Sequence, residues 1–176
     1  MGVGDVHDRK PVRAHPAEPG ASAIDELDAR LIAALTEHPR VGLMEISRRL
    51  GVARGTVQAR LDKLVARGAI TGFGPDVDPA HLGFPVLAFV FLEISQGRVD
   101  DAVAWLETVP EVMEAHGTSG PRDLLCRVAA RDPGHLQEVI NRILETPAVR
   151  RSTSYIALSE QIGFRTAPLV EAAGGG

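Results

Sequence analysis

Basic and hydrogen-bonding side chains suited to contacting a nucleic acid are concentrated between residues 45 and 68. This segment contains six basic and two acidic residues, a net charge of +4, whereas residues 69–176 contain eight basic and fourteen acidic residues, a net charge of −6. A basic segment on an acidic body is typical of a module that neutralises phosphates. We therefore predict that residues 45–68 bind DNA, the alternative being a pair of helices with a solvated basic face.

Contacts to phosphates and contacts to bases are different tasks, and the side chains of this segment divide between them. Phosphate contacts are predicted for Arg48, Arg49 and Lys63, with Arg54 able to take either role. Base-edge or groove contacts are predicted for Thr56, Gln58 and Arg60. The Gln58 amide suits adenine and the Arg60 guanidinium suits guanine. For each of these residues the alternative is a solvated helix side chain, and Arg60 lies nearer to the edge of the expected core.

The apolar residues around these side chains predict two helices joined by a tight turn. Ile46 and Leu50 are one helical turn apart in the first helix. Gly51 can adopt a positive φ in the turn without a Cβ clash, and Val52 can fill the angle between the helices. The second helix carries an apolar stripe at Val57, Leu61, Leu64 and Val65. Because both stripes must face one core, the small and hydrogen-bonding residues of the second helix point outward, which indicates a helix-turn-helix.

A further helix is predicted before this pair. Asp25 has the side chain of an N-cap, Asp28 follows near the positive end of the helix, and Pro39 ends it. Its apolar stripe comprises Leu27, Leu31, Ile32 and Leu35. Residues 24–68 are therefore expected to form a three-helix, winged helix-turn-helix domain. Residues 1–23, which are rich in Gly, Pro and charge and lack periodicity, are expected to form a disordered arm.

The second half of the chain predicts a different architecture. Residues 69–84 are expected to be a connector with a short strand-like piece over 70–74. Residues 85–162 follow a βαββαβ pattern, which predicts a ferredoxin-like domain and hence an α+β fold overall. The predicted strands are 85–94, 111–118, 123–130 and 149–160. The helix over 99–109 should bury Ala102, Val103 and Leu106, and the helix that follows Asp132-Pro133 should bury Leu136, Ile140, Ile143 and Leu144. Residues 163–176 are expected to be a C-terminal tail, disordered from Gly174.

The predicted strand at 85–94, PVLAFVFLEI, is apolar on both of its faces. A sheet with one solvated face would alternate between apolar and polar residues instead. One face of this strand must therefore meet the helices of its own domain. The other face most economically meets a second copy of the chain, which predicts a homodimer.

The sequence places no convergent set of catalytic groups, so we expect neither an enzyme nor a metal or cofactor site. Cys126 is the single cysteine and lies among apolar residues of a predicted strand, which favours a buried, inert thiol. His116 could approach it from a neighbouring strand, but spacing supplies no third group. Without a disulfide framework, a secretion signal or an apolar run of membrane length, the chain is expected to be cytoplasmic and without a membrane partner.

Four stretches, taken together in their order and spacing, resemble the Lrp/AsnC (leucine-responsive, or feast/famine) transcription regulators of prokaryotes. They are IDELDARLIAAL, HPRVGLMEISRRLGVARGTVQARLDKLVARGAITGF, DPAHLG and GPRDLLCRV. The resemblance covers about residues 24–162. It implies an N-terminal helix-turn-helix and a C-terminal effector domain whose sheets pair into dimers, which often assemble into tetramers, octamers or hexadecamers.

The resemblance also implies small effectors, usually amino acids, bound at clefts between dimers by the loop that matches residues 118–123 and by nearby strand residues. The candidate effector-binding residues are Thr118, Ser119, Gly120, Arg122, Asp123, Ser152 and Ser154. The sequence departs from the family pattern at Ala53, where a serine usually caps the recognition helix, and at Arg122, which is unusual. Arg122 either turns inward to hold a carboxylate or decorates a solvent-exposed turn.

These observations predict a transcription regulator that binds specific sites on double-stranded DNA and responds to a small effector, with an amino acid as the expected class. Two alternatives from other classes stay open. One is a DNA-organising, chromatin-like oligomer with little effector response. The other is a metabolite-binding module whose helix-turn-helix mediates protein contacts.

Overall fold

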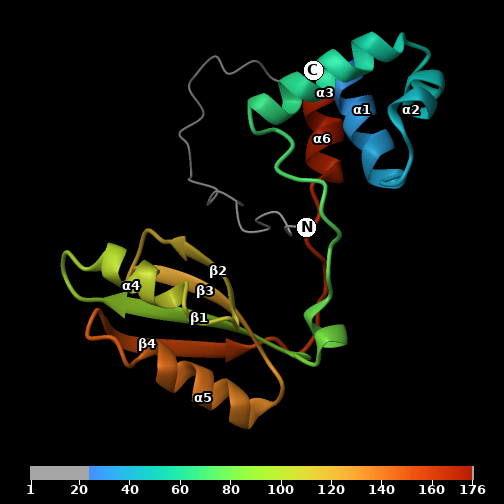
Figure 1. Ribbon diagram of the computed structural model, residues 1–176. Coiled ribbons are helices and arrows are strands. Elements are labelled where there is room, and N and C mark those ends of the chain that lie inside the picture. The colour runs from blue at the N-terminus through green and yellow to red at the C-terminus, as the bar shows by residue number, and fades with distance from the viewer. Residues whose placement is uncertain (1–23, 176) are drawn as a thin grey trace, which may run out of the picture. The chain divides into compact units, whose positions relative to one another are not determined.

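The computed structural model describes residues 24–175, and the predicted N-terminal arm at 1–23 lies outside the described residues (Figure 1). The chain divides into two units. The first runs up to Pro75 and also contains the C-terminal segment from Gly163 onward, and the second is Asp76–Ile162. The α+β class predicted from the sequence is confirmed, with helices alone in the first unit and a four-stranded sheet in the second.

Three helices form the centre of the first unit, and local signals fix where they begin. They are α1 (Glu26–Glu37), α2 (Leu43–Leu50) and α3 (Arg54–Ala66). The Asp25 carboxylate accepts a hydrogen bond from the Asp28 backbone N–H at 2.8 Å, and the Asp28 carboxylate accepts one from the Asp25 N–H at 3.4 Å. This reciprocal capping box satisfies two N–H groups at the start of α1, as the predicted N-cap requires.

The turn between α2 and α3 has the geometry that the sequence predicted. Gly51 ends α2 in the left-handed region, with φ 70°. The three helices then bury one small core of Leu31, Ile46, Val57 and Leu64. Val65 is 44% exposed, so the prediction that it belongs to the inner stripe was wrong. The next residue along an α-helix points about 100° away, and Leu64 already occupies the inward position.

The connector after α3 is not a strand in the described structure. Residues 71–78 have no regular secondary structure, so the strand-like piece expected over 70–74 was wrong, and no described residue of this unit forms the strands that a winged domain would have. Gly72, Gly74 and Pro75 punctuate the segment, and no neighbouring strand is present in the described part of this unit to pair with it. A short 3₁₀ helix, η1 (Pro79–Leu82), follows and is capped by Asp78.

The C-terminal segment contains a helix, α6 (Ala167–Gly174), that packs against α1 (Figure 1). The expectation that the chain is disordered from Gly174 was therefore wrong for that residue. Val170 and Gly174, one turn apart, are the half-buried residues of α6. A Cβ atom at Gly174 would overlap the Cβ of Ala29 in α1, so the absence of a side chain permits this close approach.

The second unit has the βαββαβ order that was predicted. Its elements are β1 (Val86–Ile94), α4 (Val99–Leu106), β2 (Val112–Gly117), β3 (Leu124–Ala130), α5 (Pro133–Ile143) and β4 (Val149–Ile156). The sheet is antiparallel with strand order β2-β3-β1-β4, so β1 and β3 are central and β2 and β4 form the edges.

Both helices of this unit cover the same face of the sheet. Ala88, Val90 and Leu92 of β1 share one core with Leu106 of α4 and Val139 of α5. Two residues predicted to be buried by these helices are instead partly exposed, Val103 at 37% and Leu144 at 38%. Val103 follows Ala102, which already occupies the inward position of α4, and Leu144 is the C-cap residue that follows the buried Ile143 of α5.

The opposite face of the sheet carries large apolar side chains along β1 and is uncovered in a single chain. Leu87, Phe89 and Phe91 of β1 point to this side, because they alternate with the core residues, and Phe89 is 38% exposed. Tyr155 of β4 is 60% exposed and contacts Phe91 edge to face, with ring centroids 5.9 Å apart. We refer below to this surface, Leu87, Phe89, Phe91 and Tyr155, as the open face.

Candidate nucleic-acid interface and effector site

The outward surface of α3 is a shallow depression lined by small and polar side chains. Gly55, Thr56, Ala59 and Lys63 line it along α3, together with Arg60 and with Asp25 from the start of α1. Apart from Arg60, the residues of α3 in this set are exposed. No side-chain hydrogen bond caps the helix at Ala53, as the sequence predicted. The first backbone N–H groups of α3 are therefore not capped by a side chain, and such groups attract anions such as phosphates.

Several predicted DNA-binding side chains form local contacts. Arg48 and Arg49 both reach the Glu45 carboxylate, at 2.9 and 3.2 Å. Gln58 donates a hydrogen bond to Asp62 one turn further along α3, at 2.8 Å. These contacts are on the surface, where ion pairs are weak and exchange readily with other partners. Arg54 and Lys63 form no ion pair with any residue that the structure describes.

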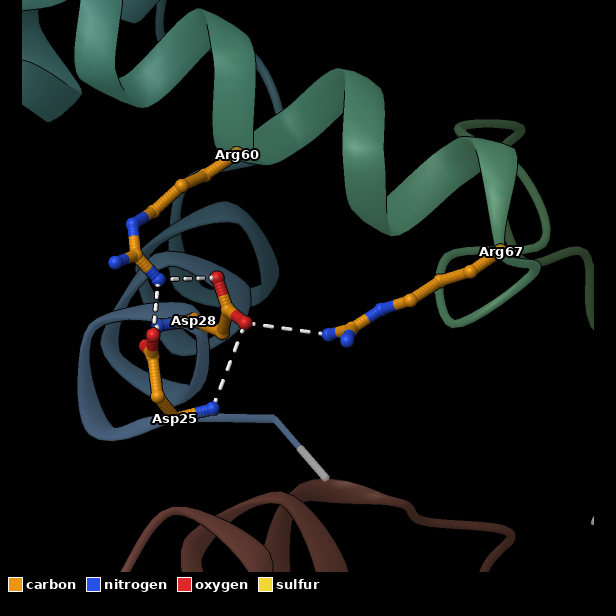
Figure 2. A network of polar contacts seen from close by, with 4 residues as sticks. All are labelled: Asp25, Asp28, Arg60 and Arg67. Carbon is orange, nitrogen blue, oxygen red and sulfur yellow. Dashed lines mark hydrogen bonds and ion pairs between the residues drawn. The ribbon is translucent and has the colours of Figure 1, made fainter. Parts of the chain in front are cut away.

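Arg60 differs from the other candidates, because it contacts α1 (Figure 2). Its Nη1 donates a hydrogen bond to Asp28 Oδ1 at 2.9 Å and another to Asp25. Arg67, at the end of α3, donates from Nη2 to the other oxygen of Asp28 at 3.2 Å. The Arg60 hydrogen bond lowers the pKa of Asp25, and the two carboxylates raise the pKa of Arg60. Asp28 therefore joins the middle and the end of α3 to the first turn of α1.

This network gives Arg60 a positioning role that the sequence reading missed. Asp25 and Asp28 precede Arg60 by 35 and 32 residues, too far for any helical spacing rule to pair them. The sequence feature that could have indicated this contact is the pair of carboxylates in the capping box at the start of α1. The predicted contact between Arg60 and a base edge stays a prediction, and in this structure the guanidinium holds α3 against α1.

The loop between β2 and β3, predicted to bind the effector, is fixed to the end of β1. Asp123 Oδ2 accepts a hydrogen bond from the Ile94 N–H at 2.7 Å, and the Asp123 N–H donates to the Leu92 carbonyl oxygen at 2.9 Å. Across the loop, the Thr118 hydroxyl donates to the Arg122 carbonyl oxygen at 2.6 Å. Gly120 has φ 144°, which a residue with a side chain rarely adopts. The loop is therefore a preorganised turn.

Arg122 is partly exposed and lies beside a carboxylate of its own chain. Its Nη1 donates to its neighbour's carbonyl oxygen at Pro121, at 3.1 Å, and lies 3.7 Å from Glu93 Oε2. Its side chain is 30% exposed. Glu93 belongs to the strand positions that alternate with the core residues of β1, so Arg122 reaches toward the open side of the sheet.

The two predicted effector-binding serines lie on the other side of the sheet. Ser152 pairs with Leu92 and Ser154 pairs with Val90, and both partners are fully buried under the helices. Directly opposed residues in an antiparallel pair point to the same face. The structure thus does not bring Ser152 and Ser154 together with Arg122. The prediction missed this because the register of β4 against β1 cannot be read from the sequence of β4 alone.

Cys126 has the properties predicted for a buried thiol. Its side chain is fully buried, and burial raises its pKa to about 11. His116 pairs with Leu125, whereas Cys126 pairs with Ala115, so the imidazole and the thiol point to opposite faces. Among residues 24–175 there is no group of three or more His, Cys, Asp or Glu side chains that could hold a metal. None of the described helices is long and apolar enough to cross a membrane.

A buried polar group on the helix side of the sheet was not predicted. Glu111 Oε1 lies 2.7 Å from Arg142 Nη2 and 3.2 Å from His135 Nε2. The Arg131 N–H donates to the other ring nitrogen of His135 at 3.1 Å. Burial raises the pKa of Glu111, but the hydrogen bond from Arg142, a backbone hydrogen bond and the positive charge of Arg142 outweigh burial and lower it. These contacts anchor α5 beside the start of β2, so we interpret them as structural.

Two family models of known proteins match this chain, one for each of its two units. A model of the AsnC-type helix-turn-helix domain matches residues 24–65, and a model of the Lrp/AsnC ligand binding domain matches residues 87–165. The HTH-type transcriptional regulator Rv2324 of Mycobacterium tuberculosis is 33% identical over 142 residues, which cover 79% of this chain and 95% of that protein.

Solved structures of related regulators have the same fold. The structure of Escherichia coli AsnC matches with a TM-score of 0.76 at 32% identity, over 84% of this chain and all of that one (100%). The regulator NMB0573 of Neisseria meningitidis, solved as a complex with L-Met, matches with a TM-score of 0.73 at 21% identity, over 83% and 99% of the two chains. The relatives and both matched domains are those of transcription regulators, not enzymes. With both of its domains matched in order, this chain belongs to the Lrp/AsnC family of transcription regulators.

Proposed function

We propose that this regulator binds specific sites on double-stranded DNA in the cytoplasm and that a small effector of the amino-acid class changes its DNA affinity. The observation that carries the proposal is the exposed surface of α3. This surface combines small residues, hydrogen-bonding side chains and unpaired cations on an otherwise acidic chain. Such a surface can approach the floor of a major groove closely while its rim contacts phosphates.

Within this proposal, the exposed side chains of α3 read bases and the arginines of α2 contact phosphates. Thr56 and Gln58 face outward from the first two turns of α3, and Arg54 at its start can reach either a base or a phosphate. Gln58 must exchange its hydrogen bond with Asp62 for one with a base. The phosphate contacts are assigned to Arg48, Arg49 and Lys63.

A homodimer is the proposed DNA-binding unit. The open face of the sheet presents two phenylalanines and a tyrosine without cover from the rest of the described chain. A second copy of this face is a suitable cover, because apolar area buried between two sheets stabilises a dimer. Two copies of α3 would then read a pseudo-palindromic site with half-sites one helical turn, or a multiple of it, apart. Further assembly to a tetramer or octamer follows the family pattern.

The proposed effector site is the loop at residues 118–123. The match to a ligand-binding family supports a small-molecule site in this unit, and the L-Met complex of the Neisseria regulator supports the amino-acid class. An effector that binds one oligomeric arrangement better than another shifts the population toward it. DNA affinity changes with it, because the arrangement determines the spacing of the recognition helices.

The proposal is tested by changing Arg54 and Gln58 to alanine together. Binding to a duplex from immediately upstream of the gene, followed by fluorescence anisotropy, should fall to the level of scrambled DNA. The oligomeric state measured by light scattering should not change. The matched control is Arg98→Ala, which also removes one positive charge but lies on the second unit, where Arg98 pairs with Asp101. If the double variant keeps its selectivity for the duplex, α3 is not the recognition helix.

A further inference from the structure

Two arginines lie beside one glutamate at the end of β1, and a third occupies the position opposite it on β4. Glu93 Oε2 lies 3.7 Å from Arg122 Nη1, and Glu93 Oε1 lies 3.5 Å from Arg150 Nη1. Arg151 is the residue of β4 directly opposite Glu93. The sheet order explains this convergence, because β1 lies between β3, which Arg122 precedes, and β4, which carries Arg150 and Arg151. We call these four residues the arginine corner.

The arginine corner is positively charged within an acidic unit. Its three arginines and one glutamate carry a net charge of +2, whereas residues 76–162 as a whole contain seven basic and thirteen acidic residues. Glu93 makes no hydrogen bond with Arg122 or Arg150, because the oxygens are 3.5 Å or more from the guanidinium nitrogens. Since one carboxylate cannot neutralise three cations, the corner can accept further negative charge.

The guanidinium groups also have unused hydrogen-bond donors. A guanidinium has five N–H donors arranged to match a carboxylate. Arg122 donates one hydrogen bond, to the Pro121 carbonyl oxygen, and Arg150 donates none to any residue in the described range. Arg122 also stands in the loop where the effector is proposed to bind, and Asp123, which follows it, supplies a carboxylate suited to an ammonium group.

We propose that the effector is an acidic amino acid, L-aspartate or L-glutamate. Its two carboxylates are bound by Arg122 and Arg150, and its ammonium group is bound at Asp123. This inference rests on the proposed function, since it assigns a chemical class to the effector of the same loop. A neutral amino acid supplies one carboxylate and leaves the second guanidinium with no anion but Glu93, which the two arginines share, so the corner discriminates against it.

Isothermal titration calorimetry of the full chain tests the assignment with L-glutamate, L-aspartate, L-glutamine, L-asparagine and L-leucine. One of the acids should bind at least tenfold more tightly than its own amide. Arg122→Gln and Arg150→Gln should each weaken that acid at least tenfold, with circular dichroism unchanged. Arg98→Gln is the matched control, because Arg98 is an exposed arginine paired with a neighbouring carboxylate, and it should leave the affinity unchanged.

Each contrary result overturns the assignment in a distinct way. If glutamine or leucine binds as tightly as the acids, the corner does not select charge. If succinate binds as tightly as aspartate, the ligand is a dicarboxylate and not an amino acid. If a neutral amino acid alters DNA binding, the proposed function stands and this inference fails. If the wild-type chain does not select its upstream duplex at all, the proposed function itself fails.

Discussion

Replacing Asp28 by alanine should destabilise the first unit and leave the second unit unchanged. Its side chain is 7% exposed and accepts hydrogen bonds from Arg60 at 2.9 Å and Arg67 at 3.2 Å. A hydrogen bond to a charged group contributes about 1.5–3 kcal/mol. Because the two arginine side chains are 31% and 24% exposed, water can replace part of what is lost. We therefore expect about 1 kcal/mol from each contact, and about 2 kcal/mol of unfolding free energy in total.

The distribution of aromatic residues allows the two units to be followed separately. The chain has one tryptophan and one tyrosine, Trp105 and Tyr155, and both lie in the second unit. Tryptophan fluorescence in urea therefore reports the second unit, whereas circular dichroism at 222 nm reports the helices of both. The unfolding free energy of so small a unit should fall by about 1 kcal/mol per molar urea. A loss of about 2 kcal/mol should therefore lower the urea midpoint of the first unit by about 2 M.

The control for this change is Asp62→Ala, which removes one negative charge from the exposed surface of α3. It should shift the dichroism midpoint by less than about 0.5 M, as is usual for a surface substitution. The reasoning would be refuted by equal shifts in the two variants, or by a shift of the fluorescence transition in Asp28→Ala. Equal shifts would mean that the Asp28 network does not hold α1 and α3 together, and a fluorescence shift would mean that its effect is not confined to the first unit.

Titration of Asp25, burial of Cys126 and packing of α6 can each be tested separately. The Arg60 hydrogen bond lowers the pKa of Asp25 in the folded chain. The stabilisation that this hydrogen bond provides is therefore present above the ordinary carboxyl pKa, and it is lost as the pH falls through the lowered pKa of Asp25 in the folded chain. Circular dichroism should therefore show the first unit weakening below about pH 4, and Asp25→Asn, which keeps an N-cap, should weaken this acid dependence. Cys126, with a pKa raised to about 11, should react with iodoacetamide at pH 8 far more slowly in the native chain than in guanidinium chloride. Gly174→Leu should detach α6 from α1, because a side chain at this position overlaps α1. Trypsin should then cleave after Arg165 several-fold faster, as mass spectrometry would measure. Unchanged cleavage would mean that α6 is not held by this contact.

Features encoded by short-range signals were predictable from the sequence. The N-cap at Asp25, the left-handed Gly51 and the apolar stripe of α3 each depend on residues within a few positions of one another. The βαββαβ order was equally accessible, because each strand and helix of the second unit has its own hydrophobic pattern and turn residues. These local preferences agree with the global fold, which is why they could be read without it.

Features that depend on distant pairing were not predictable in the same way. The contact between Arg60 and Asp28 was missed because nothing near Arg60 in the sequence indicates Asp28 as a partner. The position of Ser152 and Ser154 on the helix side of the sheet was missed because the register of β4 depends on long-range pairing. The docking of α6 depends on a contact between Gly174 and α1 across most of the chain. In each case the deciding contact joins residues that are separated by more than thirty positions.

Fluorescence anisotropy with a duplex from immediately upstream of the gene is the most direct test of the account. The protein would be titrated at two salt concentrations, without effector and with each of the twenty amino acids in turn. The account predicts tight binding that exceeds binding to scrambled DNA, weakens with salt, and changes with an amino acid, with aspartate or glutamate producing the change. Affinity of about 10⁻⁴ to 10⁻⁶ M, equal on scrambled DNA and indifferent to every amino acid, is the range of non-specific binding and would contradict it.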